Sequence, residues 1–414
     1  MTWSSWPAIA LSVGAIAGMI VRPWRTREWM WAAGAAILLL AVRAITPSAA
    51  WGAVLRGADV YAFLVGIMAL AEVARHEGLF DWLATQVLRA GAGSQRRLFF
   101  LLYALGALVT ALLSNDTTAV VLTPAVFAAL ARTDAQPRPF LFACAFIANA
   151  ASFLLPTSNP ANLVVFGRHL PALGPWVAAF GLSSLAAIVL TYFTLRLLFA
   201  RSLRARYHAT GEEPPVPAHV PIAGFAVGAA ALALIVAAAL HTDVGITALA
   251  GGIACTAIVG ARDRGAVAFV ARHVSWQVLP LVAGLFVVVA ALDRAGAVDL
   301  LRAALTHAQH AGPIAGNLEI GGLVTAACAL FNNLPVALAA GLALNAGTYA
   351  APVSHAALVA VDLGPNLSVT GSLATLLWLI ALRREGIAVT PLQFLAYGVL
   401  VTVPALAAAV LLAR

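Results

Sequence analysis

Apolar stretches that approach the length needed to cross a bilayer recur from one end of the chain to the other, with few charged residues between them. A membrane-spanning helix needs roughly 20 mainly apolar residues. Of the 414 residues, 62% are hydrophobic and 10% are charged, whereas a soluble protein carries about a quarter charged residues. The sequence therefore predicts an all-α polytopic membrane protein and excludes a water-soluble core.

The apolar pattern predicts about ten transmembrane spans. They lie at about 7–21, 29–46, 58–74, 139–167, 175–198, 221–240, 244–261, 275–292, 355–381 and 390–412. The first span has no basic segment before it, so we expect it to be retained and not cleaved as a signal peptide. Two further apolar stretches, 98–131 and 316–348, are interrupted at their centres by polar residues. We interpret them as two re-entrant helical hairpins, each of which enters and leaves the membrane on one side.

The arginines then sort by side. All 24 basic residues are arginine, and 18 of them fall in the loops of one side, at 22–28, 75–97, 132–138, 196–208, 262–272 and 383–384. The other six are Arg43, Arg56, Arg168, Arg294, Arg302 and Arg414. Because cytoplasmic loops are enriched in basic residues, both termini are predicted to be periplasmic, as in a multi-pass protein of the bacterial inner membrane. The arginines do not cluster on one face, so the net charge of +8 does not indicate a nucleic-acid partner.

The two halves of the chain resemble each other. Gly66 and Gly284, Gly78 and Gly296, Asp81 and Asp299, and Asn115 and Asn333 are each separated by 218 positions. Each half holds five spans, an odd number, so the second half must run upside down. This inverted-topology repeat is the architecture of many secondary transporters. The predicted parts are a first repeat at 1–203, a cytoplasmic linker at 204–221 and a second repeat at 222–414.

Four segments break the helical pattern, two in each repeat. The hairpin tips are SNDT (114–117) and FNNLP (331–335), and the two broken spans contain LLPTSNPANL (154–163) and DLGPNLSVTGS (362–372). Proline removes an amide donor, and Asn, Ser and Thr compete for backbone hydrogen bonds, so each segment can unwind a helix. Unwound backbone inside a membrane survives only where it is buried in protein or lines a cavity. The predicted substrate-binding residues are Asn115, Thr117, Ser158, Asn159, Asn162, Asn332, Asn333, Asn366, Thr370 and Ser372. Hydrogen bonding between packed helices is the alternative use of these side chains.

These motifs resemble those of the arsenical pump membrane protein family, within the ion transporter superfamily. SNDTTAVVLTP (114–124) is similar to the family's inward hairpin, and NNLPVALAAGLAL (332–344) to its outward hairpin. SNPANLV (158–164) and DLGPNLSVTGSLATLLWL (362–379) are similar to its two broken spans. The resemblance implies an elevator-like carrier that exports arsenite or antimonite, alone in exchange for protons or coupled to a soluble arsenical ATPase. It leaves open that ATPase and a homodimer as partners.

The chemistry of the broken segments fits a small neutral cargo. Arsenous acid carries hydroxyls that donate and accept hydrogen bonds, which Asn, Ser and Thr side chains complement. No basic residue lies in the four segments, and symporters of the superfamily commonly have threonine where this chain has Asp116. A carboxylate inside a membrane is a functional candidate by default. We therefore predict proton coupling at Asp116, with Asp362 as the second candidate; capping of a broken helix is the alternative role of Asp362.

Other chemistries are weaker alternatives. Cys144 and Cys328 could ligate trivalent arsenic, but buried cysteine usually acts as a small apolar side chain. The motifs GxSxG, HExxH and GxxxxGK[ST] are absent from the sequence, so no enzyme activity, cofactor or resident metal is expected. Two other functions stay open: a sodium/proton antiporter of the same superfamily, and a channel-like membrane subunit driven by a soluble ATPase.

Overall fold

The computed structural model describes residues 6–23, 26–208 and 219–413, and every regular element in these ranges is a helix. The elements up to residue 204 are α1 (Trp6–Val21), α2 (Glu28–Ala41), α3 (Pro47–Arg56), α4 (Ala58–His76), α5 (Leu79–Gly91), α6 (Gln95–Leu112), α7 (Asn115–Thr117), the π-helix η3 (Thr118–Leu122), α8 (Thr123–Leu130), α9 (Arg138–Ala150), α10 (Pro160–Phe166), η4 (Gly167–His169), α11 (Leu173–Leu198) and η5 (Ser202–Arg204). The elements after residue 219 are α12 (Val220–Ala239), α13 (Val244–Gly260), α14 (Arg264–His273), α15 (Val278–Arg294), α16 (Asp299–His310), α17 (Pro313–Phe331), α18 (Asn333–Ala346), α19 (Ala351–Leu363), η6 (Gly364–Leu367), α20 (Leu373–Arg384) and α21 (Pro391–Leu412).

Each predicted span and hairpin coincides with a helix or with a broken pair of helices. By length and composition, six described helical segments can cross a membrane, one of them formed by α14 and α15 together; the bent pair α3–α4 would make a seventh. The shorter apolar helices include α1, α2, α9, α13 and α18. The all-α, polytopic prediction is thus confirmed, and the hairpins and broken spans account for many of the short elements.

Two predicted loops were wrong. The segment between the second and third spans contains α3, and the loop at 262–272 contains most of α14. Both helices are short and amphipathic, so neither has a run of apolar residues long enough to be recognised as a span. The predicted linker at 204–221 lies partly outside the described residues, since 209–218 are not among them.

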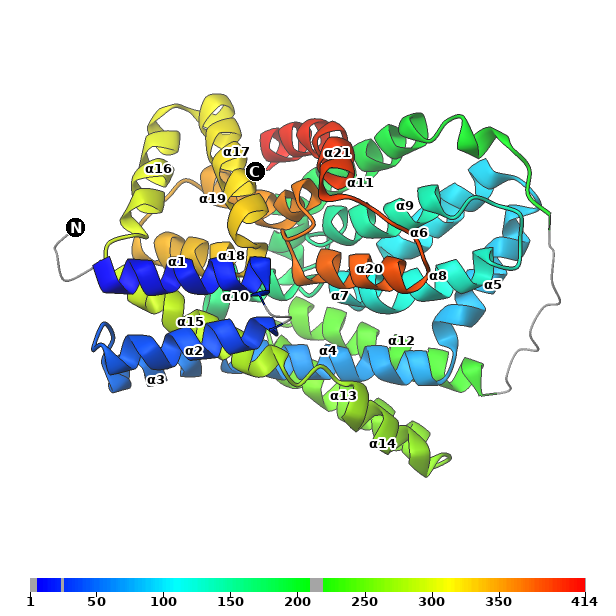
Figure 1. Cartoon of the computed structure of the whole chain (residues 1–414), viewed down its shortest axis with the longest axis horizontal. Helices are drawn as coiled ribbons and strands as arrows, with labels where there is room; N and C mark the ends of the chain where they lie inside the picture. The colour runs from blue at the N-terminus through cyan, green and yellow to red at the C-terminus, as the bar shows by residue number, and fades with distance from the viewer. Residues whose placement is uncertain (1–5, 24–25, 209–218, 414) are drawn as a thin grey trace.

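The order of elements repeats between the two halves. A pair of antiparallel neighbours (α1–α2 and α12–α13) is followed by a short amphipathic helix and a long one, α3–α4 in one half and α14–α15 in the other. Next come a lateral helix (α5 or α16), a hairpin, a broken span and a closing helix (α11 or α21). In Figure 1, α5 and α16 lie at opposite ends of the molecule's long axis, as an inverted repeat requires.

The long helices cross between the repeats. Helix α4 packs along α13, and α15 packs along α2. Both crossings occur at a glycine: a Cβ on Gly66 would lie 2.1 Å from the backbone of Ala248, and one on Gly284 would lie 2.5 Å from the backbone of Ala32. Small residues let helix backbones approach closely, which is a main source of packing energy inside a membrane.

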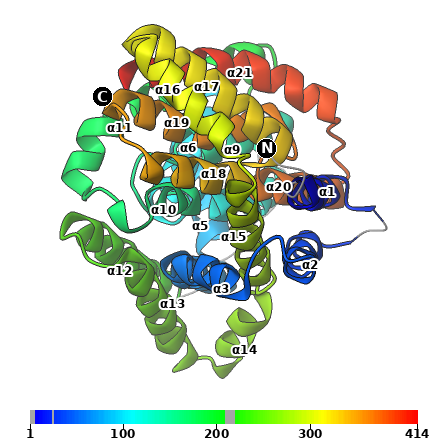
Figure 2. The ribbon, with the colours of Figure 1, turned by 90° about the vertical axis from the view of Figure 1, so that its left-hand side faces the viewer.

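The helices form two groups, which meet across a central region. The frame helices, α1–α4 and α12–α15, pack mainly on one another; most of them lie in the lower half of Figures 1 and 2. The second group consists of α6–α11 and α17–α21, and we call it the hairpin group. Within it, α6 packs on α9, α17 on α19, and α11 on α21.

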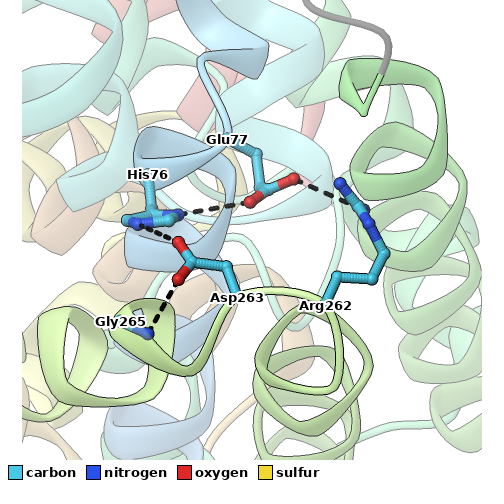
Figure 3. A network of polar contacts seen from close by, with 5 residues as sticks. All are labelled: His76, Glu77, Arg262, Asp263 and Gly265. Atoms are coloured by element: carbon cyan, nitrogen blue, oxygen red, sulfur yellow. Dashed lines mark hydrogen bonds and ion pairs between the residues drawn. The ribbon is translucent and has the colours of Figure 1, made fainter.

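A polar cluster fastens the C-terminal end of α4 to the turn between α13 and α14 (Figure 3). His76 lies 3.2 Å from Glu77 and 3.5 Å from Asp263, and Arg262 lies 3.8 Å from the other oxygen of Glu77. Asp263 also accepts the backbone N–H of Gly265 at 2.8 Å, which caps α14. The cluster therefore joins one long helix of the first repeat to two helices of the second.

Candidate functional site

Each hairpin tip is hydrogen-bonded to the broken span of its own repeat. The backbone N–H of Asn115 donates to the carbonyl oxygen of Ser158 at 3.1 Å, and that of Asn333 donates to the carbonyl oxygen of Gly371 at 2.7 Å. Both carbonyls lie directly before the residue that caps the second half of the broken span. The two repeats thus form the same backbone contact between hairpin tip and broken span.

Each helical segment that restarts after a break begins on a capping side chain. Ser114 accepts the N–H of Thr117 at 3.2 Å, and Asn332 accepts that of Leu334 at 3.1 Å. In the broken spans the two caps are the side chains of Asn159, at 3.0 Å from the N–H of Ala161, and of Ser372, at 3.0 Å from that of Thr375. At the inward tip these contacts leave no N–H unpaired, because the N–H groups of Asn115, Asp116 and Thr117 all have acceptors.

A cavity lies where the four breaks converge, between the hairpin group and α1, α4 and α15. Its polar lining consists of Asn115, Asp116, Asn159, Asn332, Asn333, Thr370, Ser372 and Glu28. Its apolar lining includes Ile16, Met19, Ile20, Leu64, Val278, Leu281, Val282 and Leu285. The cavity therefore joins amide, hydroxyl and carboxylate groups from the tips to a wall of aliphatic frame side chains. We call it the tip cavity.

Asp116 is the polar residue that lines both the tip cavity and a second, neighbouring cavity. It also lines a neighbouring cavity together with Ser114, Thr117 and Glu72. Its backbone N–H is bound to the side chain of Asn115 at 2.9 Å, but in the described chain no hydrogen bond or ion pair holds its carboxylate. The carboxylate is therefore available to a proton, to water or to a bound cargo.

Asp362 has a different environment. It is fully buried, does not line the tip cavity, and accepts hydrogen bonds from Ser152 and, at 2.6 Å, from Asn159. The structure thus separates the two predicted proton-coupling residues: Asp116 faces cavities, whereas Asp362 fastens the second broken span to the first.

The predicted binding residues divide in the same way. Asn115, Asn159, Asn332, Asn333, Thr370 and Ser372 line the tip cavity, and Thr117 lines the second cavity. Ser158, Asn162 and Asn366 lie in the packed interior instead. There, Ser158 donates to the carbonyl of Ala111 at 3.1 Å, Asn162 to that of Ser152 at 2.9 Å, and Asn366 accepts from Asn149 at 2.8 Å. For these three residues, the geometry matches the alternative role, hydrogen bonding within the packed protein. Their contact with substrate stays a prediction.

The cysteines lie away from the tip cavity. Cys144, Cys255 and Cys328 are all buried and free, and none belongs to its lining. Cys328 packs beside Gly364 and lies 3.9 Å from the carbonyl oxygen of Val361. Among the described residues, no group of three or more His, Cys, Asp and Glu side chains could hold a metal ion.

Sequence reasoning missed two features of the site. Glu28, at the start of α2, lines the tip cavity and forms an ion pair with Arg22. In the sequence it lies in the arginine-containing loop 22–28, which indicated only a side of the membrane. The second missed feature is the π-helix η3 in the inward hairpin, between the SND tip and α8. Pro124 lacks the amide that would continue the α-helical ladder, and β-branched residues precede it, so a wider turn forms; such turns are frequent at functional sites.

The charge of the tip cavity limits what it can bind. Two carboxylates, Asp116 and Glu28, lie on its wall, and none of its described lining residues is basic. Glu28 is itself paired with Arg22, which is not among the lining residues. A polyanion would meet no compensating charge from these residues, whereas a small neutral molecule with hydroxyls would find both donors and acceptors.

Comparisons with known proteins agree with this architecture. The chain is 29% identical to the arsenical pump membrane proteins of Escherichia coli and Yersinia enterocolitica over 357 residues, which cover 83% of each chain. It is 26% identical to an uncharacterized transporter of Mycobacterium tuberculosis over 371 residues, 85% of this chain and 84% of the relative. The predicted resemblance to arsenical pump membrane proteins is thereby confirmed.

A solved structure shares the fold. The Alcanivorax borkumensis YdaH transporter, which was described as having an unusual topology, superposes with a TM-score of 0.56 at 19% identity, covering 88% of this chain and 86% of that one. The profile of the citrate transporter family matches residues 8–362. The protein is a multi-pass membrane transporter, and it belongs to the citrate transporter family.

Proposed function

We propose that the protein exports arsenite and antimonite from the cytoplasm in exchange for protons. The observation that carries the proposal is the tip cavity, which presents amide and hydroxyl groups from all four breaks around one unpaired carboxylate, Asp116. Arsenous acid is neutral near pH 7, so it needs hydrogen-bond partners and no counter-charge. The relatives named arsenical pump membrane proteins support this cargo.

In this proposal, Asp116 exchanges the proton and the tip side chains hold the metalloid. Asn115 and Asn333 come from the two hairpins, and Asn159 and Ser372 from the two broken spans, so a cargo between them contacts both repeats. The hairpin group carries these residues past the frame helices, whose aliphatic side chains from α1, α4 and α15 make a smooth wall. Both termini are periplasmic and the linker is cytoplasmic in the bacterial inner membrane.

Citrate is the second cargo to test, because the family profile is that of citrate transporters. Its carboxylates would face Asp116 and Glu28 across the same cavity. Burying like charges together is unfavourable without a cation, so the described lining favours the metalloid.

The test is transport in everted membrane vesicles from a strain that lacks its own metalloid exporter. An imposed pH gradient with an acidic lumen should drive arsenite uptake without ATP, a protonophore should abolish the uptake, and an imposed sodium gradient should not replace the pH gradient. Excess antimonite should compete and excess citrate should not. Uptake driven by sodium would indicate the sodium antiporter instead, and uptake that does not saturate with arsenite would indicate a channel.

A further inference from the structure

The second cavity extends from Asp116 to the C-terminal half of α4. We call it the α4 cavity. Its polar lining is Ser114, Asp116 and Thr117 at the inward tip, Glu72 on α4 and Ser275 before α15, and its other walls are apolar. Asp116 is therefore the polar residue shared by the tip cavity, which residues of all four breaks line, and the α4 cavity, which extends to Glu72.

Glu72 reaches from this cavity toward the protein surface. Its side chain is 12% exposed and forms an ion pair with Arg75, whose side chain is 39% exposed. Arg75 in turn lies over the ring of Phe269 on α14, 5.1 Å from the ring centre. The other charged groups near this end of α4 (His76, Glu77, Arg262 and Asp263) are engaged with one another in the cluster of Figure 3. The ring of His273 stacks on Phe269 and lies 2.8 Å from the carbonyl oxygen of Phe269. Arg75 is therefore the cation that is paired with Glu72.

The two carboxylates of the α4 cavity break the internal symmetry together. Gly66 and Asn115 have their counterparts in Gly284 and Asn333, 218 positions later. At the same separation, Glu72 corresponds to Ala290 and Asp116 to Leu334. The second repeat thus preserves the packing glycine and the tip amide but has neither carboxylate, as expected if the first repeat alone provides the path to a titrating group.

We propose that the α4 cavity is the route by which protons travel between Asp116 and the surface at the C-terminal end of α4, separate from the tip cavity that takes the cargo. Glu72 is a positioning residue for this route. The inference rests on the proposed proton exchange. A proton leaves the Asp116 carboxyl group for a water molecule in the cavity, which leaves a carboxylate and a hydronium ion. The negative charge of Glu72 stabilises the hydronium ion until its proton passes to bulk water at the C-terminal end of α4.

The first test asks whether the α4 cavity contains water, and it needs no cargo. In a variant without the three native cysteines, Met68→Cys on the cavity wall should react with a small water-soluble thiol reagent. Leu70→Cys, two positions along the same helix but fully buried in the core, should not react and is the control. An unreactive Met68→Cys in folded protein would mean a dry cavity and would overturn the proposal.

The second test separates proton flow from cargo handling. In everted vesicles, Glu72→Gln should lower the initial rate of arsenite uptake driven by a pH gradient by about tenfold or more, because the hydronium ion loses the negative charge that stabilises it. Arsenite exchange at equal pH, which moves cargo in both directions without net proton flow, should remain near the wild-type rate. Glu319→Gln on α17, whose carboxylate lies outside both cavities, should change neither rate.

A double variant tests whether the defect comes only from an unpaired Arg75. Glu72→Gln leaves Arg75 without its ion-pair partner, whereas Glu72→Gln with Arg75→Gln restores the balance of charge. The proton defect should persist in the double variant. Rescue would assign the effect to the unpaired arginine, and an equal loss of exchange and gradient-driven uptake would assign Glu72 to the cargo; either result overturns the route. If wild-type protein shows exchange but no gradient-driven uptake, the proposed proton coupling itself fails.

Discussion

Asn159 and Asp362, 203 positions apart, are joined by a hydrogen bond of 2.6 Å from Nδ2 to Oδ1. Asn159 also caps the second half of the first broken span through its Oδ1, 3.0 Å from the N–H of Ala161. One side chain thus fixes the start of a half-helix on the wall of the tip cavity and links it to a buried carboxylate of the other repeat. Asp362 therefore orients the site without facing it.

The two aspartates should respond differently to the same substitution. Asp116→Asn keeps size and hydrogen-bonding capacity but cannot titrate, so pH-gradient-driven arsenite uptake should be lost while arsenite binding survives. Asp362→Asn should retain gradient-driven uptake, because its oxygen can still accept from Ser152 and Asn159. Uptake into everted vesicles and arsenite binding to purified protein, measured for both variants, check this. The reverse pattern would make Asp362 the proton carrier.

Removal of the Asp362 side chain should instead affect folding. Asp362→Ala leaves the buried side-chain amide of Asn159 without this acceptor, whereas the Ser152 hydroxyl keeps the carbonyl oxygen of Asn149 at 2.8 Å. Each unsatisfied buried group costs about 1–3 kcal/mol. We expect a lower melting temperature in detergent and less protein in the membrane. The control is Asp243→Ala at the exposed N-terminus of α13, which loses only an exposed helix cap.

The hairpin tips should share the cargo between them. Asn115→Ala and Asn333→Ala each remove an amide from the tip cavity and keep the backbone N–H that binds Ser158 or Gly371. Each should weaken arsenite binding roughly 5–150-fold, corresponding to about 1–3 kcal/mol. Asn345→Ala, on the same helix as Asn333 but outside the tip cavity, should bind normally. Wild-type affinity in both tip variants would move the binding site away from the hairpins.

The positions of the helices and breaks could be predicted from sequence because they follow from local chemistry. Long apolar runs need a membrane, and proline near Asn, Ser and Thr favours an unwound segment. The four segments at the site were predicted in this way, but the bend between α3 and α4 was not; the hairpin tips lie against the breaks of the broken spans.

The direction in which each polar side chain points could not be predicted. Asn159 and Asn162 lie three positions apart in one motif, yet Asn159 lines the cavity and Asn162 donates to the carbonyl of Ser152. That difference depends on which unwound carbonyls need a donor, and those are set by the packing of other helices. Glu28 was missed for a related reason, since only the fold brings the start of α2 to the tips.

The inverted arrangement makes a prediction about sidedness. The predicted topology places residues 204–208 and Ser48, an exposed residue in the first turn of α3, on opposite sides of the membrane. One cysteine is introduced between residues 204 and 208 and another at Ser48. In a cysteine-free variant, an impermeant thiol reagent added to intact spheroplasts should label the Ser48→Cys protein alone. In everted vesicles it should label only the linker cysteine. Labelling of the linker from outside would contradict the predicted orientation of both termini.

The native cysteines should be dispensable for transport. Cys144, Cys255 and Cys328 are buried and lie outside the lining of the tip cavity, so recognition of the metalloid is assigned to amides and hydroxyls. Alanine at all three positions removes every thiol while keeping an apolar side chain. The triple variant should still confer arsenite resistance on a sensitive strain, and its uptake should saturate at a similar arsenite concentration. Cys328→Ala alone is the control for packing, because its thiol fills the space beside Gly364. If the triple variant reaches the membrane in normal amounts but no longer binds arsenite, the metalloid is held by thiolates.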